Sequence, residues 1–171
     1  MDFLLPLLVF TQALGAVVGV VYAILAELAW VAAVKDGRLD RAERAHLVRL
    51  ATGLRFGMIS ILISSFGLVV IAYLKHGMQP AETSSYWTMI LLAILVTGLS
   101  WALSRKKIPF VLGSAAIFTG WWFLATLVLG QAPEMNFGSA LAFYVVATGI
   151  FTGILYYSRM LILNSVQKTL T

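Results

Sequence analysis

Glu27 is the one carboxylate that lies well inside a long apolar run, residues 3–34. A charged side chain within the hydrocarbon of a bilayer is costly, so it usually faces a bundle interior or water and often belongs to an ion or proton pathway. Its partner could be Arg55, Arg49 or Arg159. We expect Arg55 or Arg49, because both lie on the next apolar stretch, which runs antiparallel to the first. Three roles stay open: an ion pair that fixes two helices, a relay for a proton or cation, and a carboxylate that reaches cytoplasmic water.

The amide of Gln12 is a further polar group in the same stretch, one helical turn from Gly15. Side-chain amides in membrane bundles commonly hydrogen-bond to a neighbouring helix, although an amide can also bind a ligand. We expect the interhelical hydrogen bond. The candidate polar site is therefore Glu27, Arg55, Arg49 and Gln12.

Glycines recur four residues apart, which places each pair on one face of a helix. The pairs are Gly15 and Gly19, Gly53 and Gly57, and Gly149 and Gly153. Small residues let helix backbones approach closely, and such contacts hold helices together in lipid. We expect these glycines to pack helices within the bundle. A seam between copies of the chain or a narrow solute path is the alternative.

Five apolar stretches position these residues. They cover residues 3–34, 47–74, 86–103, 108–130 and 137–163. Each approaches or exceeds the roughly 20 residues that a helix needs to cross about 30 Å of hydrocarbon. The chain is 61% hydrophobic and only 11% charged. We therefore predict an all-α fold, in which residues 1–171 form a single domain of five transmembrane helices.

The basic residues indicate the orientation of this bundle. All of them except Lys75 lie in residues 35–55, in residues 105–107, or at Arg159 and Lys168. Connections rich in Lys and Arg remain in the cytoplasm. We therefore expect the N-terminus outside and the C-terminus inside, in a cytoplasmic (inner) membrane. The net charge of +5 then reflects topology and contact with lipid headgroups, not a nucleic-acid partner.

Asp40 and Glu43 have the spacing of a capping box, in which each side chain bonds a backbone N–H at a helix start. This pattern predicts a helix that begins just after Asp40, ahead of the second apolar stretch. The first two spans then form an antiparallel hairpin.

The other chemistry-bearing residues indicate no cofactor and no enzyme. The chain has no cysteine, which excludes thiolate metal sites and cysteine nucleophiles. Its two histidines, His46 and His76, lie at opposite ends of the second span, so they cannot ligate one haem. No residue pattern places a nucleophile beside a base, and none brings several metal ligands together.

Four segments resemble a group of small, mostly uncharacterised bacterial membrane proteins that are similar to copper-resistance D-like and cytochrome b561-like bundles. The segments are Gln12-Ala13-Leu14-Gly15, Lys35-Asp36-Gly37-Arg38-Leu39-Asp40, Arg55-Phe56-Gly57 and Ser65-Phe66-Gly67. The resemblance implies a helix bundle and its orientation. Haem-binding members would have histidines near Gln12 and Ala102, and this chain has none there, so the resemblance implies no haem.

These features predict a small membrane protein, an oligomeric channel- or transporter-like bundle for an ion or small solute. The alternative is a non-catalytic accessory subunit of a larger membrane complex. The expected partners are the lipid bilayer and either further copies of the chain or other membrane subunits.

Overall fold

The computed structural model describes residues 3–34, 40–132 and 135–169. Within these residues all regular structure is helical. The helices are α1 (Leu4–Val34), α2 (Arg41–Leu74), the short 3-10 turn η1 (Pro80–Glu82), α3 (Ser84–Ser104), α4 (Phe110–Val128) and α5 (Phe137–Thr169). The five α-helices are each long and apolar enough to cross a membrane. The predicted all-α bundle of five spans is confirmed.

The start of α2 is set by the capping box predicted from the sequence. The Asp40 side chain accepts from the backbone N–H of Arg41 at 2.6 Å, and the Asp40 N–H donates to Glu43 Oε2 at 2.9 Å. The capping box is complete, because the Asp40 side chain also accepts from the backbone N–H of Glu43. The preceding residues 35–39, which contribute to the family resemblance, lie outside the described residues.

The end of α3 is a tight turn that gathers basic side chains. Lys106 has a left-handed backbone, with φ of 55°. The N–H of Lys106 bonds the carbonyl of Leu103 at 3.0 Å, and the N–H of Lys107 bonds that of Ala102 at 2.9 Å. This pair of bonds is the Schellman arrangement that commonly ends a helix. It holds three consecutive basic residues beside the last turn of α3.

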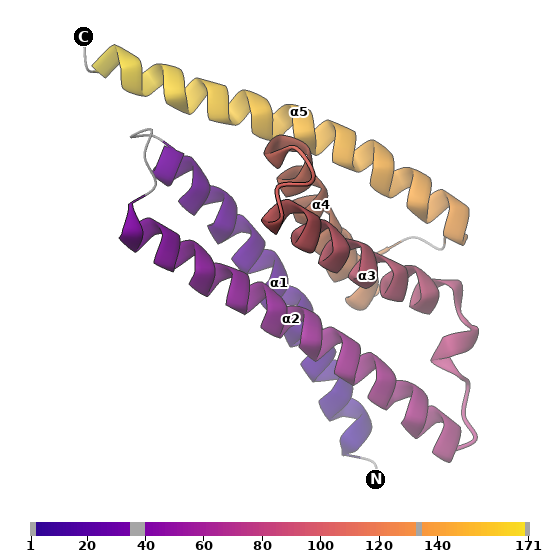
Figure 1. The fold of residues 1–171 in the computed structure, drawn as a ribbon. Helices are drawn as coiled ribbons and strands as arrows, with labels where there is room; N and C mark the ends of the chain where they lie inside the picture. Colours follow the sequence, from indigo (N-terminus) through magenta and orange to yellow (C-terminus); the bar gives the residue numbers. More distant parts are fainter. Residues whose placement is uncertain (1–2, 35–39, 133–134, 170–171) are drawn as a thin grey trace.

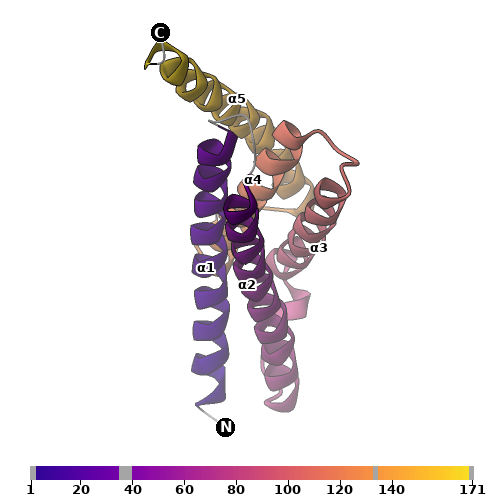
Figure 2. The same ribbon diagram turned by 60° about the vertical axis from the view of Figure 1, so that its left-hand side comes forward.

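Helices α1 and α2 lie side by side as a long antiparallel hairpin (Figure 1 and Figure 2). A Cβ added to Gly57 would lie 2.8 Å from the carbonyl oxygen of Gly15 and 3.2 Å from the backbone N of Gly19. The two backbones are therefore in contact, which only glycine permits here. The ring of Tyr22 fills the space beside Gly53. The glycines of the first two spans thus pack helices within the chain.

Helix α4 is the centre of the bundle. In the most apolar 18-residue stretch of α4, 56% of the stretch is buried, whereas in that of α5 only 17% is buried. Trp121 of α4 is 1% exposed and packs into the space that the missing side chain of Gly19 leaves on α1. Ile61, Val96 and Leu124 complete a core shared by α2, α3 and α4.

The expectation that Gly149 and Gly153 pack helices within the bundle is wrong for the single chain. Both are exposed, and a Cβ added to either would meet no atom within 4 Å. The reason is that α5 turns another face to the bundle, where Ala140 and Tyr144 are buried and the Tyr144 hydroxyl donates to the Ala116 carbonyl at 2.9 Å. The two glycines lie on the outward side of α5.

The environments of Gly57 and Gly149 predict different effects of adding one methyl group. Gly57→Ala forces a Cβ against the backbone of α1 and is expected to lower the free energy of unfolding by about 1–3 kcal/mol. Gly149→Ala is the matched control and should leave stability unchanged in the isolated chain. Thermal unfolding in mild detergent, followed by circular dichroism, measures both. Equal effects of the two substitutions would contradict the close contact at Gly57.

Candidate functional site

Glu27 pairs with Arg159 inside the bundle, where α1, α4 and α5 meet. The guanidinium of Arg159 donates from Nε to Glu27 Oε1 and from Nη2 to Glu27 Oε2, both at 2.8 Å. Nη2 also donates to Ser114 Oγ on α4 at 2.9 Å. The side chains of Arg159 and Glu27 are 12% and 13% exposed. A two-pronged, charge-assisted pair of this kind is strong and fixes the orientation of both partners.

Aromatic rings complete the surroundings of the pair. The Arg159 guanidinium lies 5.1 Å from the centre of the Phe110 ring, and Phe110 stacks on Trp30 at 3.9 Å between centroids. Nη1 of Arg159 is buried and has no hydrogen-bond partner among the described residues. Its N–H groups can therefore donate to a bound oxygen atom, and a buried donor without a partner is otherwise unfavourable.

The expected partners Arg55 and Arg49 are wrong, and Arg159, the third candidate, is the partner that the structure shows. Both α2 arginines are exposed, and neither forms an ion pair with Glu27 in the described residues. At this level α2 presents Leu47, Ala51 and Leu54, which line a cavity together with Glu27. Glu27 points instead toward α4 and α5.

A mostly apolar pocket of about 370 Å³ lies beside the pair; we call it the Glu27 pocket. Helices α1, α2, α3 and α4 line it. Its apolar walls include Trp30, Leu54 and Phe110, and Glu27 and Ser114 are polar groups on its surface. An apolar cavity with a few convergent polar groups is the usual form of a small-molecule site. The sequence did not reveal Trp30 and Phe110, because nothing in their spacing shows that the ends of α1 and α4 meet.

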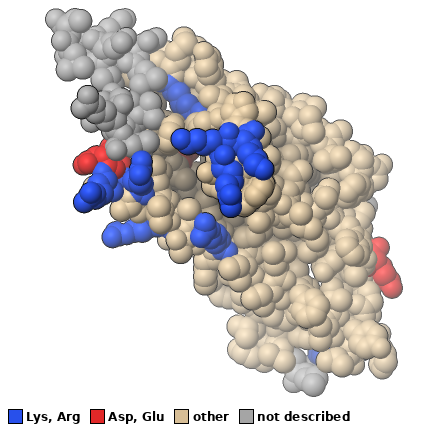
Figure 3. Space-filling view, in the orientation of Figure 1, with Lys and Arg blue, Asp and Glu red and all other residues tan. Residues whose placement is uncertain are grey.

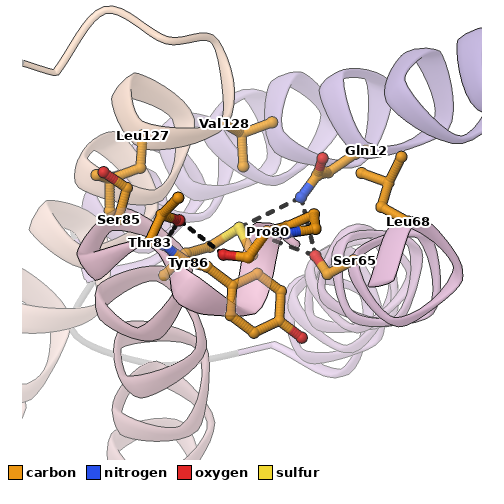
Figure 4. A pocket seen from close by; sticks show the side chains of 10 residues that line it. Gln12, Ser65, Leu68, Pro80, Thr83, Ser85, Tyr86, Leu127 and Val128 are labelled. Atoms are coloured by element: carbon orange, nitrogen blue, oxygen red, sulfur yellow. Dashed lines mark hydrogen bonds between the residues drawn. The ribbon is translucent and has the colours of Figure 1, made fainter. Parts of the chain in front are cut away.

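Gln12 lines a second pocket, of about 180 Å³, near the opposite end of the bundle (Figure 4). Its Nε2 donates to Ser65 Oγ at 2.8 Å and lies 3.3 Å from Met89 Sδ. The amide thereby links α1, α2 and α3. We call this cavity the Gln12 pocket; Thr83 and Tyr86 also line it. Gln12 and Glu27 therefore belong to two separate sites.

A packed layer lies between the two pockets. Ile61, Val96 and Trp121 are each 1% exposed or less. On each of their helices these residues lie between the residues that line the Gln12 pocket and those that line the Glu27 pocket. This packed layer separates the Gln12 pocket from the Glu27 pocket.

The fold and these sites define a polytopic membrane protein with a buried ion pair. Among the described residues no group of three or more His, Asp or Glu could hold a metal ion. Comparison with known proteins finds no matching family model, curated protein or solved structure. The resemblance to copper-resistance D-like and cytochrome b561-like bundles therefore stays a prediction.

The geometry predicts that removing one partner of the Glu27–Arg159 pair lowers the free energy of unfolding more than removing both partners does. Glu27→Met leaves the Arg159 charge buried without compensation and should lower the free energy of unfolding by about 3–5 kcal/mol. The double variant Glu27→Met with Arg159→Met should recover much of that loss. Arg55→Gln, on an exposed arginine, is the control. Thermal unfolding in detergent checks all three, and a double variant as unstable as the single one would argue against a paired role.

Proposed function

We propose that the chain is a small transporter-like membrane protein that moves an ion or small solute, with Glu27 as the group that takes up a proton or cation. The observation that supports this most directly is the intramembrane carboxylate at the surface of the Glu27 pocket. Ionisable groups in such positions commonly mark ion pathways and proton relays. We propose no catalytic role, in keeping with the lack of a nucleophile–base pair in the sequence.

The ion pair offers a simple way to couple uptake to a change of shape. A proton or cation bound at Glu27 would weaken its attraction to Arg159. Helix α5 is the least buried span, and its described polar links to the bundle include this pair and the bond from Tyr144 to Ala116. Loss of the pair would therefore loosen the end of α5 from α1 and α4. A bistable element of this kind is what a transport cycle requires.

The two pockets support a transporter-like function over an open pore. Each lies toward one end of the bundle, and the layer of Ile61, Val96 and Trp121 closes the space between them. Alternating access needs a barrier that can move from one side of a site to the other, which a permanently open channel lacks.

Charge distribution supports the proposed orientation. The basic side chains visible in Figure 3 gather toward the end of the bundle where α2 begins and α3 ends. Cytoplasmic ends of membrane bundles have this excess of Lys and Arg. We therefore propose that the Glu27 pocket opens toward the cytoplasm of the inner membrane and the Gln12 pocket toward the outside.

Proton flux into liposomes tests the role of Glu27. Vesicles containing the chain and trapped pyranine are given an inward proton gradient, with valinomycin and potassium clamping the potential. We expect faster acidification than in empty vesicles. The double variant Glu27→Gln with Arg159→Gln removes both charges without leaving one unpaired, and it should reduce the rate to that of empty vesicles.

Glu82→Gln is the matched control, because Glu82 is an exposed carboxylate in η1, far along the chain from the pair. It should transport like the unmodified chain. Ile117→Phe, which adds bulk to the wall of the Glu27 pocket, should also slow flux. Unchanged flux in the double variant, or no acceleration by the unmodified chain, would overturn the proposed relay.

A second candidate function is that of a non-catalytic accessory subunit. The exposed outer face of α5 favours this function. Gly149 and Gly153 leave the backbone of α5 accessible on its outer side, beside the exposed Val146 and Ile150. Small residues facing outward in a span are typical of contacts with another helix. The partner on this face distinguishes the two functions, since a second copy fits a homo-oligomeric transporter and a different chain fits a subunit.

Native mass spectrometry on the tagged chain, extracted from its own membrane in mild detergent, identifies that partner. We expect a homo-oligomer, and the double variant Gly149→Leu with Gly153→Leu should dissociate it because the added side chains block close approach. Gly98→Leu, at an exposed α3 glycine that also contacts nothing, is the control. Stoichiometric association with other chains would instead establish the subunit.

A further inference from the structure

A third cavity lies between α2 and α3, with Trp121 of α4 also on its wall. Its volume is about 370 Å³, and Leu54, Met58 and Val96 supply apolar walls. Thr97 and Trp101 also line it and are exposed, so the cavity opens on the outer surface of the helices. We call it the Arg55 pocket, because Arg55 is the one charged residue in its lining.

Three basic side chains lie in the wall of this pocket or beside Trp101, one of its lining residues. Arg55 lies in its wall. At the end of α3, the guanidinium of Arg105 lies 5.5 Å and the ammonium of Lys107 lies 4.7 Å from the Trp101 ring centre. Figure 3 shows basic side chains over α2 and over the α3–α4 turn on the same face of the molecule. The pocket therefore combines an apolar interior with a cationic rim.

The carboxylates of the described chain do not neutralise this rim. Glu27 is bound to Arg159, and Asp40 and Glu43 bond backbone groups at the start of α2. Glu82 lies in η1, before α3 begins. Among the described residues Arg55, Arg105 and Lys107 form no ion pair. Among the described residues no carboxylate is left to pair with these three cations, so an anion from outside the chain can supply the compensating charge.

The depth of Arg55 indicates where that anion comes from. Arg55 lies about 12 Å along the helix from Leu47, where the second apolar stretch begins. An arginine at that depth extends toward the headgroups or pairs with an anion. Basic pockets between transmembrane helices on the cytoplasmic side bind the headgroups of anionic lipids. A water-soluble phosphate would leave the apolar interior of the pocket empty.

We propose that the cleft between α2 and α3 holds an anionic phospholipid of the surrounding bilayer. Arg55, Arg105 and Lys107 bind its phosphate-containing headgroup, and an acyl chain occupies the Arg55 pocket. This site is distinct from the Glu27 site, although the two neighbouring pockets share Ala51, Leu54, Ser100 and Ser104. The proposal does not depend on transport.

Tryptophan quenching by brominated lipid tests the site, because Trp101 and Trp121 line the pocket. The full chain in mild detergent is titrated with phosphatidylglycerol that has bromine atoms on its acyl chains. We expect saturable quenching at concentrations where phosphatidylcholine with the same brominated chains quenches little. Trp101→Phe should remove part of the signal.

Charge variants locate the headgroup. Arg55→Gln and Lys107→Gln should each raise the half-quenching concentration about fivefold, the factor that corresponds to roughly 1 kcal/mol per basic residue. Arg49→Gln is the matched control, since Arg49 is exposed on the same helix and does not line the pocket. An equal loss in Arg49→Gln, or equal binding of phosphatidylcholine, would show unspecific attraction and overturn the proposal.

A substitution that leaves the charge of the protein unchanged tests whether an acyl chain occupies the pocket. Thr97→Phe fills the pocket from an exposed position of its lining and should weaken quenching by phosphatidylglycerol while leaving the three cations in place. Millimolar inorganic phosphate should not displace the lipid. Displacement by phosphate, or unaltered lipid binding in Thr97→Phe, would mean that the cations recognise phosphate alone and would overturn the lipid site.

Discussion

The contact between the backbones of α1 and α2 determines where the other helices lie. It exists because Gly15, Gly19 and Gly57 have no side chains at the crossing. Lipid offers no hydrophobic force to join two apolar helices, so van der Waals contact at close range has to supply the attraction. Gly19 also leaves a space that the Trp121 ring fills, which places α4 against α1. A single crossing thus orients three spans.

The polar site follows from that arrangement. Once α1 and α2 are in contact, Glu27 lies on the side of α1 that faces α4, where Arg159 binds it and also donates to Ser114. Burying two opposite charges together costs desolvation that their attraction and the Ser114 bond offset. The stacked rings of Trp30 and Phe110 shield one side of the pair from lipid. The pair therefore contributes orientation at least as much as stability.

Much of the architecture was predictable from sequence, because the signals were local. Five apolar runs gave the spans, and the Asp40–Glu43 spacing gave the start of α2. The partner of Glu27 was harder, since it depends on which helices meet across the bundle. The sequence favours Arg49 and Arg55 as partners because they lie on the neighbouring span, whereas Arg159 is 132 positions away from Glu27. Periodicity places a residue on a face of its helix and does not say which helix covers that face.

The glycines show the same limit. Identical spacing in α1, α2 and α5 produced close packing in the first two helices and an open surface in the third. Spacing alone could not separate these outcomes, because both a neighbour in the chain and a separate molecule select small residues. The three pockets could not be predicted from the sequence either, since each is lined by several helices.

The ion pair joins the first helix of the chain to the last. During synthesis Glu27 enters the bilayer early, and Arg159 emerges only after 131 intervening residues have been made. Until then the carboxylate lacks the partner that it has in the folded bundle. Closure of the bundle is consequently a late step in biogenesis, and a ribosome that stalls before α5 leaves a chain with an unneutralised acid in the membrane.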